Sequence, residues 1–318
     1  IEVKGFEVKN LRGTGQYLYL ESFVLSSNKP PRARLEFEVA QVTGVRRKTR
    51  ILEAGDNLYY ESNQLQQYQD GYTISFIDPT RDEVTFLNGL VLRKGDVVGD
   101  TSEKAMRRVQ IRETILSHFE KEEKLFHQGI KTLSLFFIDE VVKYRQYDED
   151  GQELLGEYGR MFEEEYTNIL NDYIQLFDTP YQAFLRRDQV ADVHKGYFSI
   201  DKKTRRSVDS AVRRGSDISD DISAYDLILK NKERLLSFEE KTRFIFSHSA
   251  LREGWDNPNV FQICTLKSSD STTTKRQEVG RGLRICVNHA GARMDADTLG
   301  DSVHDINMLT VIASESYK

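Results

Sequence analysis

The sequence predicts an α/β fold, in which a three-layer domain with a mainly parallel sheet follows a β-rich accessory region. Three observations support this fold class. From residue 101 onward, segments with the apolar period of a helix alternate with short apolar runs of strand length, which is the pattern of βαβ units. Residues 132–138 are apolar almost throughout, as expected for a parallel strand covered on both faces. The length of 318 residues fits about two structural units.

The accessory region is expected over residues 1–100. Runs of alternating or β-branched residues separated by Gly, Pro, Asn and Asp predict strands at 1–8, 17–24, 34–42, 71–77 and 83–92. The first of these strands is a candidate to join the main sheet. Arg46, Arg47, Lys48 and Arg50 are interpreted as one basic turn, which could contact phosphate but is more often just a solvated loop.

The main domain is expected over residues 101–318. Apolar periodicity predicts helices at 101–129, 157–177, 181–193 and 224–236. Strands are predicted between and after them at 132–138, 196–200, 242–247, 260–266 and 308–313. Strands that alternate with helices over this length indicate a mainly parallel sheet with helices on both faces.

Composition excludes several classes of protein. Two cysteines and six scattered histidines provide neither a disulfide framework nor a metal-ligand cluster, so no metal site is expected. No apolar run approaches the ~20 residues of a membrane span, and no basic-then-apolar leader is visible. A cytoplasmic protein without a membrane partner is therefore expected, and the start at Ile1 favours a piece of a longer chain.

The net charge hides two opposite segments. With 45 Lys and Arg against 51 Asp and Glu the chain carries −6, which by itself argues against a basic nucleic-acid module. Residues 148–165, however, hold eight acidic residues and one basic, whereas 195–214 hold seven basic and two acidic. Because the segments differ so much, the total says little about binding partners.

The most informative segment runs from 244 to 285. An apolar strand ends in the hydroxyl residues Ser247 and Ser249, followed by Gly254 and Asp256. Ligands of open α/β sheets bind at the carboxyl ends of strands, where hydroxyls and backbone N–H groups can meet phosphate. The plain alternative is an ordinary loop with an N-capping serine.

A second block, residues 271–285, contains Gln277, Gly280, Arg281 and Arg284. The spacings of four and three predict that Gln277 and the two arginines share one helical face. Arginines that cannot lose their charge suit a polyanion and can neutralise the charge that develops in phosphoryl transfer. The alternative is a solvated basic face.

Taken together, the two blocks resemble motifs V and VI of superfamily 2 helicases and translocases. The segments SHSALREGWDNPNVFQICTL, QEVGRGLRICVN and LSLFFIDEVVKYR are similar to the restriction (Res) subunit of type III restriction-modification enzymes. The resemblance covers roughly residues 105–318 and implies the second RecA-like domain of an ATP-dependent motor. It is vague over residues 1–100.

For the nucleotide, the resemblance implies a role for each matching residue. Arg281 and Arg284 match the motif VI arginines that reach the γ-phosphate of ATP. Gln277 matches the opening polar position of the motif, and Gly280 lies between Gln277 and Arg281. Gly254 and Asp256 match the motif V pair that lies against nucleotide and couples it to DNA.

For DNA, the resemblance implies contacts from motif V to the strand backbone. Ser247 or Ser249 matches the hydroxyl position, and Arg252 lies between these serines and Gly254. The implied partners are DNA, a first RecA-like domain and a nuclease domain of the same polypeptide, and a methyltransferase (modification) subunit.

Half of the ATP site is expected to be missing from this chain. Asp139 and Glu140 end an apolar run like a Walker B box, but no G-x-x-x-x-G-K-[ST] loop occurs, so they are interpreted as strand-end carboxylates. ATP and Mg²⁺ are thus expected only in the full-length protein, with the Mg²⁺ ligands outside this chain. A DNA-repair or phage-defence helicase and a non-enzymatic nucleic-acid-binding scaffold stay open as alternatives.

Overall fold

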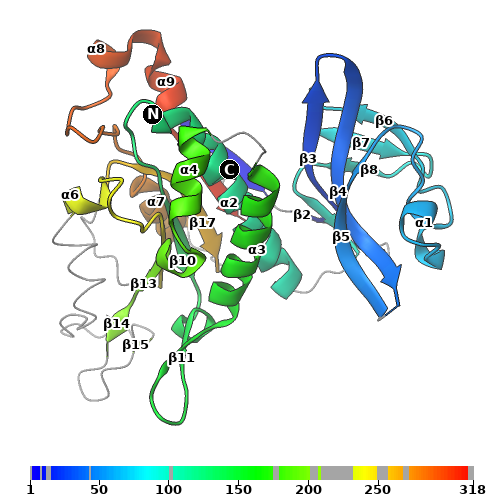
Figure 1. Ribbon diagram of the computed structural model, residues 1–318, viewed down its shortest axis with the longest axis horizontal. Coiled ribbons are helices and arrows are strands. Elements are labelled where there is room, and N and C mark those ends of the chain that lie inside the picture. Colours follow the sequence, from blue (N-terminus) through cyan, green and yellow to red (C-terminus); the bar gives the residue numbers. More distant parts are fainter. Residues whose placement is uncertain are drawn as a thin grey trace. The chain divides into compact units, whose positions relative to one another are not determined.

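A computed structural model describes most of the chain, in two compact units. The described residues are 2–7, 9–11, 16–42, 44–99, 103–174, 179–200, 207–208, 232–248, 257–267 and 272–313. One unit comprises Ile1–Phe6 with Gln110–Lys318, and the other comprises Glu7–Val109 (Figure 1).

The larger unit is built on a six-stranded sheet. Its strands, in spatial order, are β1 (Glu2–Glu7), β18 (Met308–Ala313), β17 (Val260–Leu266), β10 (Leu133–Ile138), β16 (Phe244–Ser247) and β13 (His194–Tyr197). The five strands from β18 to β13 are all parallel to their neighbours. Since helices lie along the chain between β10 and β13 and between β17 and β18, the predicted α/β class with a parallel sheet is confirmed.

Helices cover both faces of this sheet, because successive side chains of a strand point to opposite sides. Leu133, Leu135 and Phe137 of β10 belong to a core with Ile263 of β17, and helix α7 (Thr272–Gly280) adds Val279 to that core. On the other face, the rings of Phe136 and Phe162 lie 6.0 Å apart. Phe162 lies in α3 (Glu157–Tyr173), which with α2 (Glu103–Phe126) and α4 (Pro180–Arg187) covers that face (Figure 1). The result is three layers.

Short elements complete the larger unit. They are η2 (Val141–Lys143), β11 (Arg145–Tyr147), β12 (Glu153–Leu155), η3 (Val190–Asp192), β14 (Ser199–Ile200), β15 (Ser207–Val208), α6 (Lys232–Leu235), α8 (Ala296–Leu299), η5 (Gly300–Ser302) and α9 (Val303–Ile306). The helix predicted over 181–193 ends at Arg187, where Asp188 turns to extended backbone. Within the described part of the chain, no helix is long and apolar enough to cross a membrane.

The smaller unit packs two sheets on a common core; the pairs in both are antiparallel except β2 with β9, which is parallel. One sheet has the order β2 (Lys9–Leu11), β9 (Asp96–Val98), β3 (Leu18–Ser26), β4 (Lys29–Gln41) and β5 (Gly44–Leu52); the other consists of β6 (Ile74–Asp78), β7 (Glu83–Phe86) and β8 (Val91–Arg93). Helices α1 (Leu58–Glu61) and η1 (Gln66–Tyr68) lie in the β5–β6 connection. Leu35 and Phe37 of β4 share the core with Phe86 of β7, which is why alternate β4 residues are buried.

One expectation about this unit was wrong. The basic residues from Arg46 to Arg50 do not form a turn but lie in β5, and the pair Gln41↔Gly44 shows that the chain reverses before them. Because β5 pairs on only one side, at the end of its sheet, its side chains can stay polar on both faces. The apolar pattern that identifies a strand is therefore weak there.

Candidate functional site

Ser247 ends β16 at the carboxyl edge of the parallel sheet. It is paired in register with Phe137 of β10 on one side and with Tyr197 of β13 on the other. Parallel strands end at the same edge, so the segments that follow β10, β13, β16 and β17 all leave the sheet there. This edge is where ligands of open α/β sheets bind.

The serine itself is inside the protein. Ser247 is 1% exposed, and its Oγ makes no hydrogen bond within the residues that the structure describes. The next residue, His248, is half-buried. The remaining predicted residues of this segment lie outside the described residues, and they are Ser249, Arg252, Gly254 and Asp256.

Helix α7 carries the second predicted block only in part. Gln277 is exposed and Gly280 is the last helical residue. The backbone N–H of Arg281 donates to the carbonyl of Glu278 at 3.2 Å, which tightens the chain into a turn. The expectation that Gln277, Arg281 and Arg284 share one helical face is therefore wrong, since both arginines follow the helix.

The reason for this ending lies in the sheet below. A Cβ built on Gly282 would lie 2.6 Å from Leu309 Cδ1 and 3.2 Å from Ile263 Cδ1, so the backbone of Gly282 rests on β17 and β18. Leu283 packs against the same core. Glycine also has low helix propensity, and the packing of Leu283 against the core further favours an end of the helix here.

The two arginines of this loop differ in exposure. The guanidinium of Arg284 is exposed, and its Nη1 donates to the carbonyls of Gly280 at 3.2 Å and Leu283 at 2.9 Å. Such bonds satisfy carbonyls that the end of a helix leaves open. Arg281 is half-buried beside it. The loop thus presents two cations within four residues.

A pair that the sequence reading missed fixes the last turn of α7. Lys267, directly after β17, forms an ion pair with Glu278 at 2.5 Å, and its Nζ lies 5.7 Å from the ring centroid of Phe137. Glu278 is 5% exposed. This contact ties the end of the helix to the carboxyl edge of the sheet. Its only sequence signal was a lysine directly after an apolar strand.

Asp139 and Glu140 follow β10 at the same edge. Lys143 Nζ lies 2.6 Å from Asp139 Oδ2 and 3.4 Å from Glu140 Oε1. Burial lowers the pKa of Lys143, but the hydrogen bonds and charge attraction from Asp139 and Tyr158 together outweigh burial, so the pKa is raised overall. Both carboxylates thus contact one local lysine, which offsets one of their two negative charges, as strand-end groups with a structural role would.

The donor groups on the α7 loop suit phosphate rather than a metal ion. Guanidinium groups bind phosphate oxygens through several N–H donors, and Arg281, Arg284 and Gln277 all supply N–H donors. Mg²⁺ requires oxygen ligands, usually carboxylates. Among the described residues, no group of three or more His, Cys, Asp or Glu side chains could hold a metal ion. These residues fit the phosphate chain of ATP and do not fit its Mg²⁺.

Comparison with known proteins relates the chain to one kind of enzyme subunit. No protein-family model matches it. It is 40% identical over 214 residues to the EcoP15I Res subunit of Escherichia coli, a type III restriction-modification enzyme, covering 65% of this chain and 20% of that protein. The EcoPI Res subunit of Escherichia phage P1 is 39% identical over 221 residues, covering 67% of this chain and 21% of that protein.

A third relative, the StyLTI Res subunit of Salmonella typhimurium strain LT2, is 38% identical over 232 residues, covering 65% of this chain and 22% of the relative. The chain thus spans about a fifth of the length of the curated relatives it matches. Over about two thirds of its own residues, this chain is related to the Res subunits of type III restriction-modification enzymes.

Proposed function

We propose that this chain is the second RecA-like domain of an ATP-dependent DNA translocase or helicase, the restriction subunit of a type III restriction enzyme. The observation that carries the proposal is the loop after α7, because its Arg281 and Arg284 have the spacing of motif VI and follow a helix that packs on a mainly parallel sheet. The likeness to three Res subunits supports the same assignment.

In this proposal the nucleotide binds between this domain and a first RecA-like domain that carries the P-loop. ATP supplies the phosphoryl group whose transfer to water drives the motor. Arg281 and Arg284 stabilise the charge that develops on the γ-phosphate, which is the role of an arginine finger. Gln277 and Gly280 line the nucleotide side of the loop, with Gly254 and Asp256 of motif V beside them. The Mg²⁺ ligands belong to the first domain.

Arg284 has a second task in this arrangement. Its bonds to the carbonyls of Gly280 and Leu283 hold the loop in shape when no phosphate is within reach. Exchanging these two neutral acceptors for phosphate oxygens strengthens the bonds, because hydrogen bonds between charged groups are the stronger kind. Lys267 and Glu278 keep the last turn of α7 in place during that exchange.

The DNA side of the proposal uses the segment after β16. Of the two candidate serines, Ser247 is 1% exposed, so Ser249, together with Arg252, is the one that contacts the sugar-phosphate backbone of one strand. Phosphate contacts make such binding depend strongly on salt. The whole protein would be a cytoplasmic, ATP-dependent type III deoxyribonuclease with a separate nuclease domain and a modification subunit as partner, while this chain alone would be inactive.

The test joins this chain to a first RecA-like domain that carries a P-loop and measures DNA-stimulated ATP hydrolysis. We expect Arg281→Ala and Arg284→Ala each to lower turnover by ~10³-fold. Arg276→Ala is the matched control, because Arg276 is an exposed cation of α7, the helix that precedes both arginines. Unchanged turnover in both variants would reject the assignment and favour a binding scaffold, and strong ATPase activity of this chain alone would contradict the shared site.

A further inference from the structure

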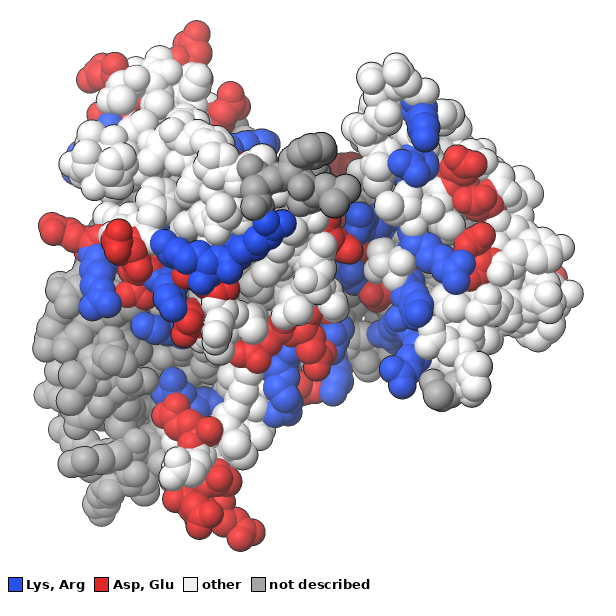
Figure 2. Space-filling view, viewed as in Figure 1, with Lys and Arg blue, Asp and Glu red and all other residues white. Residues whose placement is uncertain are grey.

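Strand β5 concentrates positive charge on an edge of the smaller unit. Arg46, Lys48 and Arg50 alternate along it and therefore point to the same side. Arg47 points to the other side, where its guanidinium lies 3.6 Å from the ring centroid of Tyr17. In Figure 2, blue side chains gather on the smaller unit where Figure 1 draws the end of the β4–β5 pair that carries the turn.

Two of the three aligned cations are available for a ligand. Arg50 is paired with Glu61 of α1 at 2.7 Å. Arg46 and Lys48 are exposed, and neither side chain forms an ion pair or hydrogen bond with any residue that the structure describes. The charge on this edge is therefore not neutralised by the unit itself.

The hairpin is held rigidly. Strands β4 and β5 pair in continuous register from Ala33↔Leu52 to Gln41↔Gly44. Near the turn, the N–H of Ala40 donates to the carbonyl of Ser62 at 3.0 Å, and Asn63 Nδ2 donates to the carbonyl of Ala40 at 2.7 Å. The cations are thus presented on a fixed strand and not on a loop.

The spacing of the cations suits a nucleic-acid backbone. Alternate residues of a strand lie about 7 Å apart, so the three cations span about 13 Å. Duplex DNA carries one charge per ~1.7 Å of its axis, so several phosphates lie within the length that the cations span. The exposed apolar residues near the turn are Val42 and Val45, and the hairpin's one aromatic residue, Phe37, is buried. Without an aromatic surface for stacking bases, phosphate is the group that this edge fits.

A charged edge strand also keeps sheets from pairing with other chains. Protection of that kind can use either sign of charge, whereas residues 44–52 carry four cations and no carboxylate. We propose that the exposed edge of β5 is a contact surface for the phosphate backbone of duplex DNA, with Arg46 and Lys48 as its binding groups. The proposal rests on the proposed function, in which DNA is the substrate, and adds a second contact surface from the β-rich unit.

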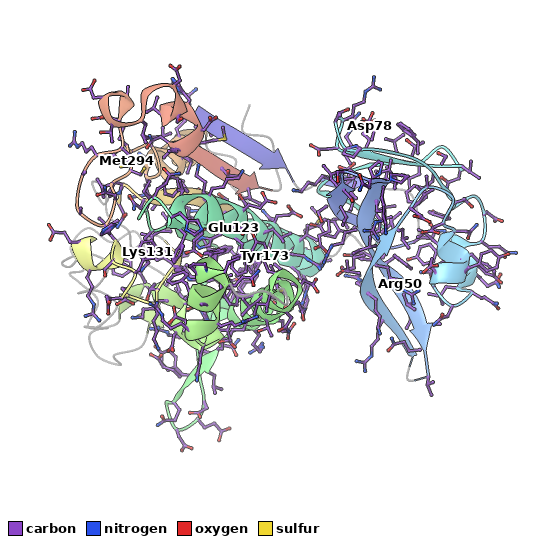
Figure 3. The ribbon with its side chains drawn as sticks, turned by 45° about the horizontal axis from the view of Figure 1, so that its top comes forward. Arg50, Asp78, Glu123, Lys131, Tyr173 and Met294 are labelled. Carbon is purple, nitrogen blue, oxygen red and sulfur yellow. The ribbon has the colours of Figure 1, made fainter. Side chains whose placement is uncertain are left out.

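The test measures binding of the whole chain to a fluorescent duplex of about 30 base pairs by anisotropy, from about 50 to 200 mM salt. The test variant is the double substitution Arg46→Ala with Lys48→Ala. The control, Arg81→Ala with Lys94→Ala, removes the same amount of charge elsewhere in the unit. Arg81 follows β6, and the last residue of β6, Asp78, lies away from Arg50 of β5 in Figure 3.

We expect the test variant to bind about tenfold more weakly and the slope of log K against log salt to fall by about 2, one for each phosphate contact. The control should keep both values. Equal affinity and slope in the two variants would overturn the proposal, as would failure of the wild-type chain to bind duplex. A single strand bound more tightly than the duplex, with the same loss in the test variant, would overturn the assignment to duplex.

These outcomes are separate from those of the proposed function. ATP hydrolysis by the joined domains depends on Arg281 and Arg284, whereas the salt slope depends on Arg46 and Lys48. If ATP hydrolysis falls as expected in Arg281→Ala and Arg284→Ala but the salt slope is unchanged in the β5 variant, only the β5 surface is rejected. If the slope falls in the β5 variant but ATP hydrolysis is unchanged in Arg281→Ala and Arg284→Ala, only the ATP site is rejected.

Discussion

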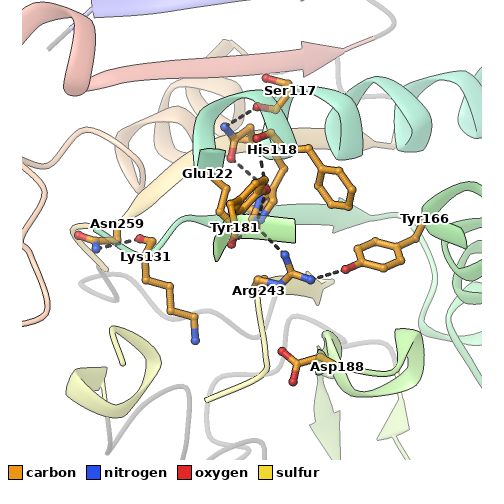
Figure 4. A network of polar contacts seen from close by, with 12 residues as sticks. Ser117, His118, Glu122, Lys131, Tyr166, Tyr181, Asp188, Arg243 and Asn259 are labelled. Atoms are coloured by element: carbon orange, nitrogen blue, oxygen red, sulfur yellow. Dashed lines mark hydrogen bonds and ion pairs between the residues drawn. The ribbon is translucent and has the colours of Figure 1, made fainter. Parts of the chain in front are cut away.

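Arg243 and Glu122 form an ion pair inside the larger unit. Arg243 Nη1 lies 2.6 Å from Glu122 Oε2, and both side chains are 0% exposed. Glu122 also accepts a hydrogen bond from the hydroxyl of Tyr181 at 3.0 Å, and Arg243 donates to the hydroxyl of Tyr166 (Figure 4). Since Arg243 precedes β16 and Glu122 lies in α2, the pair joins the amino end of the sheet to the helix above it.

Removing one partner of this pair should strongly destabilise the larger unit. Arg243→Met leaves Glu122 buried without its counter-charge, and an unpaired buried charge typically costs about 3–5 kcal/mol. We expect the free energy of unfolding to fall by about that amount. Urea unfolding followed by circular dichroism at a helix band measures it, because the long helices α2 and α3 dominate that signal.

Two further variants show that the cost comes from the unpaired charge. Lys241→Met breaks an exposed pair with Asp192 in the same unit, 2.9 Å apart and about half exposed, and should change little. The double variant Glu122→Gln with Arg243→Met should recover part of the loss, since no charge is left alone. A loss that is equal in Lys241→Met and Arg243→Met would contradict this account.

Stability in acid should depend on the same carboxylate. Burial raises the pKa of Glu122, but Arg243 and His118 outweigh burial and lower the pKa to about 2 from 4.5. A carboxyl whose folded pKa is depressed stabilises the fold above its unfolded pKa and loses that contribution as pH falls toward the folded pKa. The stability difference between wild type and Glu122→Gln should therefore shrink from about pH 4.5 to about pH 2. A difference that stays constant over this range would contradict the assigned pKa.

Lys131 should produce a pH dependence of the same sign at higher pH, because its folded pKa is lowered as well. Its Nζ donates to the carbonyls of Ser237 at 2.8 Å and of Glu240, and burial lowers its pKa to about 7 from 10.5. Between these values the unfolded chain holds a proton that the folded chain has released, so the free energy of unfolding rises with pH. Relative to Lys131→Met, wild-type stability should increase from about pH 7 to 10.5. Parallel stability curves for the two proteins would show that Lys131 keeps its proton when folded.

The sequence predicted those elements whose pattern lies in neighbouring residues, and it missed features that depend on residues far away in the chain. Strands β17 and β18 were predicted with the same bounds that the structure has, because each is an apolar run bounded by polar residues. The burial of Arg243 could not be predicted, because its counter-charge Glu122 lies 121 positions earlier. Strand β5 was missed for the same reason, since only pairing with β4 makes its charged residues extended.

The candidate site was predicted in composition but not in geometry. The residue types and spacing around Arg281 and Arg284 indicated phosphate chemistry, and a helix was expected before them. The helical face was wrong because Gly282 rests on Leu309 and Ile263, a contact with strands from other parts of the chain. Helical periodicity describes only residues that stay in one helix, so it could not reveal this departure.

The contact of Gly282 with the sheet should make this glycine hard to replace. In Gly282→Ala the new Cβ would meet Leu309 Cδ1 at 2.6 Å and Ile263 Cδ1 at 3.2 Å, so the loop or these side chains must move. We expect overpacking to lower the free energy of unfolding by about 1–3 kcal/mol. Because Arg281 and Arg284 flank this residue, ATP hydrolysis by the joined domains should fall as well.

Gly280→Ala is the matched control, because a Cβ at Gly280 meets nothing within 4 Å and the residue is helical. Alanine in a helix is favoured over glycine by up to about 1 kcal/mol, so this variant should be as stable as wild type or more so. Leu309→Ala, added to Gly282→Ala, removes the clashing atoms and should restore part of the lost hydrolysis, although it opens a cavity in the core. If instead Gly282→Ala matches wild type in both stability and hydrolysis, the loop after α7 does not rest on β17 and β18, and the reason for the helix ending at Gly280 must be sought in its sequence alone.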